Sequence, residues 1–288
     1  MNVNTKFKNS VFVKLFDDPD LLRELYCAIE GVTLPPDAPV SINTLENVLF
    51  MDVVNDISFE IDGKLIILIE HQSTINPNMA VRMLIYFVNL LESLIESKKL
   101  YSTSLLPVPW PEFYVLYNGS KPYPDQIIMK LSDHFKNLHE LGLPEKSRPL
   151  LELEVKVLNI NEGRNEHIVK RCKKLAEYSL FTARARSFTE EMGSRKKGIK
   201  TAIKYCTNHG ILNEFLEIHA KEILNMLLTE WNTEDAIAYA RVETEEKWRG
   251  IIAENDNKWH SMVAEKNAKL ADKDMEIVKL KAELDARQ

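Results

Sequence analysis

Apolar residues at helical spacing open the chain. Between residues 5 and 30 they recur every three or four positions, first around Phe12 and again after Asp20. Gly31 and the pair Pro35-Pro36 are residues that end helices. The pattern therefore predicts helical structure up to residue 30 and a different kind of structure beyond it.

Strand patterns follow. Residues 48–54 are apolar and β-branched, and residues 57–61 alternate between apolar and polar side chains with period two. Asp62-Gly63 indicates a turn, and residues 64–72 are typical of a buried strand. We therefore expect a β-hairpin between residues 57 and 72.

The remaining sequence alternates at first and is then helical. An amphipathic helix is expected over residues 79–99, strands at 113–117 and 150–160, and helix from Glu166 onward. Strands interleaved with helices indicate an α/β fold, followed by an all-helical C-terminal extension.

The segment 246–288 has a pattern of its own. Its apolar positions follow 4-3-4-3 spacing, which is typical of a long solvated helix or of a weak coiled coil. Both alternatives stay open, because polar residues interrupt the apolar seam. A homodimer through the C-terminal helices is one expectation. The seam residues are Trp248, Ile252, Asn255, Trp259 and Met262.

Composition limits the class of protein. Of 288 residues, 45% are apolar and 28% charged, values at which a globular core forms. The N-terminus lacks the apolar stretch of a signal peptide, and the aliphatic run Leu65–Ile69 is far too short to span a bilayer. Cys27, Cys172 and Cys206 have no CxxC spacing, which argues against a disulfide framework or a zinc site. We expect a soluble, cytoplasmic protein with no membrane partner and no small-molecule cofactor.

Positive charge is concentrated in one segment. The net charge is −6, but Arg164–Lys204 holds twelve lysines and arginines against four glutamates, so it carries +8 and the remainder −14. A basic strip engages phosphates over about one Debye length, roughly 8–10 Å. A solvated helical face explains the same charges equally well. The residues for which DNA contact is predicted are Lys170, Lys173, Lys174, Arg195, Lys196 and Lys197.

The hairpin carries the candidate chemistry. Glu70 and Gln72 lie two apart on its second strand and so point to one face, whereas His71 points to the other. Asp56 belongs to the preceding strand. Carboxylates that converge from adjacent strands are what a hard cation such as Mg²⁺ requires. The metal would polarise a phosphodiester and lower the pKa of a bound water, which together give hydrolysis.

The hydrophobic pattern also predicts the register of the hairpin. Odd-numbered residues form the apolar face of both strands, so the loop must hold an odd number of residues. The loop Ile61-Asp62-Gly63 fits, with Gly63 in the left-handed position of a type I turn plus G1 bulge. Asp56 then shares a face with Glu70 and lies diagonal to it. The alternative is that Glu70 is a surface carboxylate at a strand end, and Asp52 is the rival acid.

Six segments between residues 4 and 245 form an ordered series: NTKFKNSVFVKLF, NDISFEIDGKLIILIEHQS, MAVRMLIYFVNL, LPVPWPEFYVLYNG, VKVLNINEGRNEHI and GIKTAIKYCTNHGILNEFL. Together they resemble the bacterial recombination-promoting nucleases, the transposase-like branch of the PD-(D/E)XK nucleases. The resemblance implies a restriction-endonuclease-like core, a mixed sheet flanked by helices, over residues 1–190. A helical extension would follow at 191–245, and a long helix or weak coiled coil at 246–288.

The resemblance also implies an activity, that of a Mg²⁺-dependent DNA endonuclease acting in recombination or transposition. Asp56, Glu70 and Gln72 would be catalytic. The metal would be held by the first two carboxylates and the main-chain carbonyl of His71. Arg82 and Tyr86 match the R-x-x-x-Y of the family and would either hold a phosphate or, as we favour, support the sheet.

Two positions depart from the family pattern. Gln72 stands where many PD-(D/E)XK enzymes have lysine, so it can orient water or phosphate by hydrogen bonds but adds no positive charge. Asn4 stands where an acidic residue is expected. These departures favour a second hypothesis, a weakened or inactive nuclease fold that binds DNA or a partner. A toxin-like RNase is a third.

Overall fold

The computed structural model describes residues 10–43, 56–137, 144 and 148–285. The chain divides into two compact units, Met1–Trp231 and Asn232–Gln288. The first unit holds the sheet, the helices on both of its faces and the first part of the last helix. The second unit is the continuation of that helix. The finer division into 1–190, 191–245 and 246–288 stays a prediction about separate folding units.

Two capped helices begin the described chain. The side chain of Ser10 accepts a hydrogen bond from Val13 at the start of α1 (Val11–Leu15), and Asp18 caps α2 (Pro19–Glu30) in the same way. Gly31 ends α2 in the left-handed conformation, with φ +70°. The helical prediction is thus confirmed from residue 11 to 30, apart from the break between the two helices.

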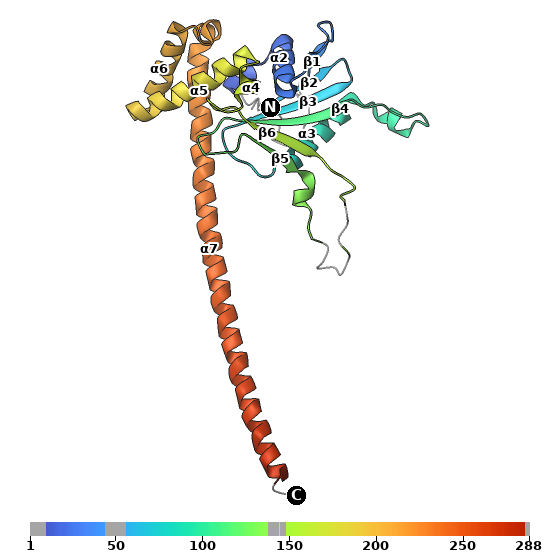
Figure 1. Cartoon of the computed structure of the whole chain (residues 1–288), viewed down its shortest axis with the longest axis vertical. Coiled ribbons are helices and arrows are strands. Elements are labelled where there is room, and N and C mark those ends of the chain that lie inside the picture. Colours follow the sequence, from blue (N-terminus) through green and yellow to red (C-terminus); the bar gives the residue numbers. More distant parts are fainter. Residues whose placement is uncertain (1–9, 44–55, 138–143, 145–147, 286–288) are drawn as a thin grey trace, which may run out of the picture. The chain divides into compact units, whose positions relative to one another are not determined.

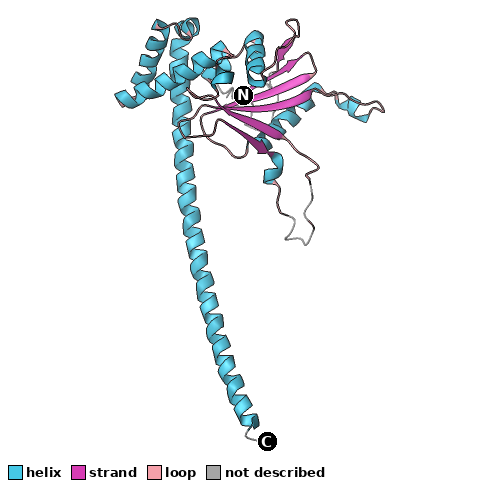
Figure 2. Ribbon diagram, viewed as in Figure 1, coloured by secondary structure: helices cyan, strands magenta, loops and turns pink. Residues whose placement is uncertain are grey.

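A six-stranded sheet forms the centre of the first unit, in the order β1-β2-β3-β4-β6-β5 (Figures 1 and 2). Pairing is parallel for β3–β4 and β4–β6 and antiparallel for the others, so the sheet is mixed, as expected. The expected strand at 48–54 lies outside the described residues, and β1 and β5 were not anticipated. The strands are β1 (Val40–Ile42), β2 (Ile57–Ile61), β3 (Leu65–Gln72), β4 (Trp110–Tyr117), β5 (Gln126–Lys130) and β6 (Glu154–Asn159).

The hairpin β2–β3 has the register parity that the hydrophobic pattern predicts. Ile57 pairs with Ile69 and Phe59 with Ile67, and all four side chains are buried in one cluster. The even-numbered residues of β3 point to the opposite face, where Ile66 and Leu68 join a second cluster. This confirms that Glu70 and Gln72 share a face and that the odd-numbered isoleucines lie on the other.

The turn of this hairpin differs from the expected one by one residue. Ile61 pairs with Leu65, so the three-residue loop is Asp62-Gly63-Lys64 rather than Ile61-Asp62-Gly63. Both Asp62 and Gly63 have positive φ, +53° and +59°, and the N–H of Lys64 donates to the carbonyl of Ile61. A type I turn has negative φ at both positions, whereas the primed turn that suits strand twist has positive values. The shift places Asp56 opposite Glu70, not diagonal to it.

Each face of the sheet is covered by different helices (Figure 2). Helix α3 (Met79–Leu94) packs on Ile66 and Leu68, and the 3-10 helix η1 (Ser97–Tyr101) follows it; the helix expected over 79–99 therefore ends early. Helices α1 and α2 cover the other face together with four later helices. These are α4 (Glu166–Val169), α5 (Lys173–Met192), α6 (Arg195–Asn208) and the first part of α7 (Asn213–Asp285). The short 3-10 helix η2 (Leu131–His134) packs on the α3 side.

The second unit is helical along its described length. Trp248, Ile252, Trp259 and Met262 are exposed on α7. The homodimer stays a prediction. No helix among the described residues is both long and apolar enough to cross a membrane.

A close approach between α5 and α6 gives a stability prediction. A Cβ added at Gly198 would meet the Oγ1, Cα and N of Thr189 at 2.4, 2.5 and 2.5 Å. Because two of these atoms belong to the backbone, the helices would have to separate. We expect Gly198→Ala to lower the free energy of unfolding by about 1–3 kcal/mol, measured by chemical denaturation. Gly250→Ala is the control, since nothing lies within 4 Å of that Cβ and alanine favours helix. An unchanged free energy of unfolding in Gly198→Ala would contradict the close packing of α5 against α6.

Candidate active site

Asp56 and Glu70 occupy opposed positions at the open end of the hairpin β2–β3. The register extended by one residue places them opposite each other. The Oδ2 of Asp56 accepts a hydrogen bond from the main-chain N–H of His71 at 2.8 Å, so its side chain reaches across to β3. The Asp56 carboxylate is therefore hydrogen-bonded to the end of β3, the strand that carries Glu70.

His71 contributes its backbone to this end of the hairpin and its ring to the other face. Its imidazole stacks on Phe12, with centroids 4.8 Å apart, and its Nε2 lies 3.1 Å from the hydroxyl of Tyr178. In a strand, the N–H and C=O of one residue point to the same edge. Since the N–H of His71 points to Asp56, its carbonyl also faces that edge. The carbonyl, for which a metal-binding role was predicted, therefore faces the β2 edge of β3.

Glu70 is fully buried, and a cation from α3 balances its charge. Its Oε1 lies 2.5 Å from Nη2 of Arg82, whose side chain is 26% exposed. The hydroxyl of Tyr86 lies 2.6 Å from the same Nη2 and 3.1 Å from Nε. Burial would lower the pKa of Arg82, but the charge of Glu70 and the contact with Tyr86 outweigh it and raise that pKa above its ordinary value. The guanidinium therefore stays charged.

Gln72 completes this group. With its amide turned so that the oxygen faces Arg82, that oxygen accepts from Nη1 at 3.1 Å and the nitrogen donates to the carbonyl of Thr74 at 3.3 Å. This orientation satisfies both amide atoms, whereas the opposite one leaves the nitrogen against the sulfur of Met79 at 2.9 Å. Arg82 thus bridges the two polar side chains at the end of β3.

Comparison with known proteins decides the family. A family model described as "Putative transposase, YhgA-like" matches residues 12–194, well over half of the chain. The chain belongs to this family. The family is part of the PD-(D/E)XK-like transposase group, which agrees with the resemblance found in the sequence. No curated protein and no solved structure matches the chain.

Two buried thiols of this transposase-family chain are poorly suited to act as nucleophiles. Burial raises the pKa of Cys172 to about 12 and that of Cys206 to about 11, so neither thiol ionises near neutral pH. No group of three His, Cys, Asp or Glu side chains in the described residues could hold a metal ion. Asp56 and Glu70 make a smaller set, to which Mg²⁺ adds carbonyl or substrate oxygens. Asn4 and Asp52 lie outside the described residues.

The basic residues predicted to contact DNA lie on or next to helices of the other sheet face. Lys170 pairs with Glu166, and Lys173 and Lys174 both approach Glu177, at 3.8 and 3.4 Å. Arg195, Lys196 and Lys197 are on α6, whose core residues join the cluster of Ile67 and Ile69. This is the face opposite to Glu70 and Gln72. Whether these six residues contact DNA stays a prediction, but the layers do not place them on the face of the carboxylates.

Arg82 is a site residue whose contact with Glu70 was not predicted from the sequence. The interpretation that Arg82 and Tyr86 support the sheet covers only part of what they do, because the guanidinium also contacts Glu70. The signal that could have found it is spacing. A helix that packs on the even-numbered face of β3 must present its inward side chains to Glu70, and an arginine there has a carboxylate to pair with.

The ion pair gives a prediction for stability. Arg82→Met removes the cation that balances a buried charge and should cost about 3–5 kcal/mol of unfolding free energy. Adding Glu70→Gln should recover a large part of this loss, because the charge disappears with its partner. Urea denaturation of the two single variants and the double variant measures the coupling. Lys64→Met, which breaks the exposed pair with Asp62, is the control and should change stability little. If the losses of unfolding free energy in the two single variants add up to the loss in the double variant, Arg82 and Glu70 do not stabilise each other.

Proposed function

We propose that this chain is a Mg²⁺-dependent DNA endonuclease that hydrolyses phosphodiester bonds in transposition or recombination. The observation that carries the proposal is the pair Asp56 and Glu70, opposed across β2–β3, with the main-chain N–H of His71 donating to Asp56. Membership of the transposase family supports a nuclease-like role.

The donor set at this position fits Mg²⁺. Asp56 and Glu70 offer carboxylate oxygens and His71 offers a carbonyl oxygen, and a hard cation of this size takes oxygen ligands from one or two carboxylates. When bound, the metal would supply Lewis-acid activation of the phosphodiester and a water of lowered pKa. The hydrogen bond from the N–H of His71 fixes the direction of the Asp56 carboxylate.

Two neighbouring side chains have separate tasks in this proposal. Gln72 is neutral, so it orients a water or phosphate oxygen by hydrogen bonds without stabilising charge strongly. Arg82 is a positioning residue, since its guanidinium contacts one carboxylate oxygen of Glu70 and fixes the direction of that side chain. The positive charge that Gln72 lacks is thus present on Arg82 of α3, which the Gln72 amide oxygen contacts directly.

One observation favours a second candidate, a nuclease fold that binds DNA or a partner without cleaving. Arg82 already occupies one oxygen of Glu70 at 2.5 Å, and its positive charge opposes that of an incoming cation. If this repulsion exceeds the attraction of the metal to Asp56 and to the substrate phosphates, the metal does not bind. The fold then binds DNA or a partner without cleaving. Metal-dependent cleavage separates the two candidates.

The test is nicking of supercoiled plasmid by the purified full chain, with Mg²⁺ or with EDTA. Asp56→Ala and Glu70→Ala should each abolish nicking, because the ligands that remain in either variant would bind Mg²⁺ too weakly. Gln72→Ala should lower the rate by about 10–100-fold, as expected for a neutral orienting group. Glu60→Ala removes a half-buried carboxylate of the same hairpin and should leave the rate unchanged. Full activity in Glu70→Ala, or activity in EDTA, would place cleavage elsewhere. No activity in the wild type would favour the non-cleaving candidate.

A further inference from the structure

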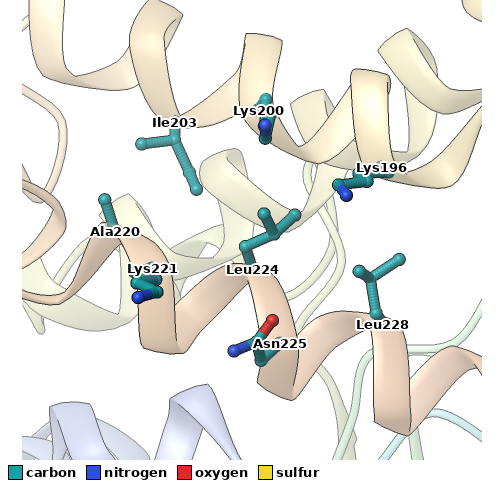
Figure 3. Close-up of a pocket in the computed structure, with 8 residues that line it drawn as sticks. All are labelled: Lys196, Lys200, Ile203, Ala220, Lys221, Leu224, Asn225 and Leu228. Carbon is teal, nitrogen blue, oxygen red and sulfur yellow. The ribbon is translucent and has the colours of Figure 1, made fainter.

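Two kinds of basic residue share the positive segment of the chain. Four of them, before α6, pair with a nearby glutamate. Lys196 and Lys200 of α6 instead line a groove between α6 and α7, and Lys221 of α7 lines its other wall (Figure 3). Within the described part of the chain, no carboxylate forms an ion pair with any of these three lysines. The groove therefore gathers positive charge that the fold itself does not neutralise.

The floor of this groove is apolar. Ile203 of α6 and Leu224 and Leu228 of α7 lie between the lysines, and Leu224 is 9% exposed. The cavity measures about 510 Å³, and none of the side chains that line it is acidic. A ligand that fits must present an apolar surface with negative charge on its flanks.

The shape of the groove favours a helix as that ligand. Two neighbouring helices leave a furrow into which the side chains of a third helix pack, at an interaxial distance of roughly 8–10 Å. Lys196 and Lys200 are one turn apart on one wall, and Lys221 stands on the other, so acidic residues on both flanks of a docked helix would meet a lysine. Duplex DNA offers the negative charge but no apolar face to cover Leu224 and Leu228.

We propose that the groove between α6 and α7 binds an acidic amphipathic helix of a partner protein. Leucine-like anchors of the partner would cover the apolar floor, and its glutamates or aspartates would pair with the three lysines. This role is independent of phosphodiester cleavage, because the groove lies on the face of the sheet opposite to Glu70.

The probe is a fluorescein-labelled, helix-forming peptide with leucines on one face and glutamates on both flanks, titrated against the full chain by fluorescence anisotropy. We expect saturable binding that Lys196→Glu combined with Lys200→Glu weakens by on the order of tenfold or more. Lys197→Glu combined with Lys204→Glu is the matched control, with the same charge change on the same helix outside the groove. It should weaken binding far less. Leu228→Asn tests the floor, and thermal denaturation confirms that each variant is folded.

Three results would overturn the proposal. The first is no binding of the peptide to the wild-type chain. The second is an equal loss in both lysine pairs, which would mean general attraction between charges. The third is equal affinity for a peptide with serines in place of the leucines, together with displacement by duplex DNA, which would make the groove a phosphate-binding surface.

Discussion

The arrangement of the candidate site depends on how the fold balances one buried charge. Glu70 is fully buried on the face of β3 that packs against α3, where an ionised carboxylate with no countercharge would cost several kcal/mol. Arg82 supplies the countercharge, and Tyr86 and Gln72 hold its guanidinium in place. One contact therefore fixes a helix against a strand and sets the direction of an acidic side chain. The site is built on this rigid junction.

The same contact connects stability with chemistry. A metal ion at Asp56 and Glu70 has to share the glutamate with Arg82. Its affinity therefore depends on the balance between its attraction to the two carboxylates and its repulsion by the guanidinium of Arg82. The hydrogen bond that Asp56 accepts from the N–H of His71 comes from a neutral donor. The chemistry is therefore asymmetric: one carboxylate is held by a neutral donor and the other by a full positive charge.

The sequence allowed prediction of the parts of the fold that depend on local pattern. Period-two alternation identified the odd-numbered face of β2 and β3, and this placed Glu70 and Gln72 together. The predicted turn was wrong by one residue, because the alternation of apolar residues requires a loop of odd length but does not fix where the loop begins. Both Asp62 and Gly63 adopt positive φ, so the turn could form one residue later. The contact of Arg82 with Glu70 could not be derived, since periodicity shows that α3 has an inward face but not which strand residue each side chain reaches. Likewise, both Lys196 and Lys170 were predicted from the sequence to contact DNA. Only the fold shows that Lys170 forms an ion pair with Glu166.

The central claim is that Asp56 and Glu70 together form a metal-binding active site, and anomalous diffraction tests it most directly. Crystals of the full chain grown with Mn²⁺ in place of Mg²⁺, measured at the manganese absorption edge, locate the ion without reference to activity. We expect an anomalous peak in contact with both carboxylates, and its loss in Asp56→Asn. A saturated crystal with no peak at this position, or with its peak at other carboxylates, would contradict it.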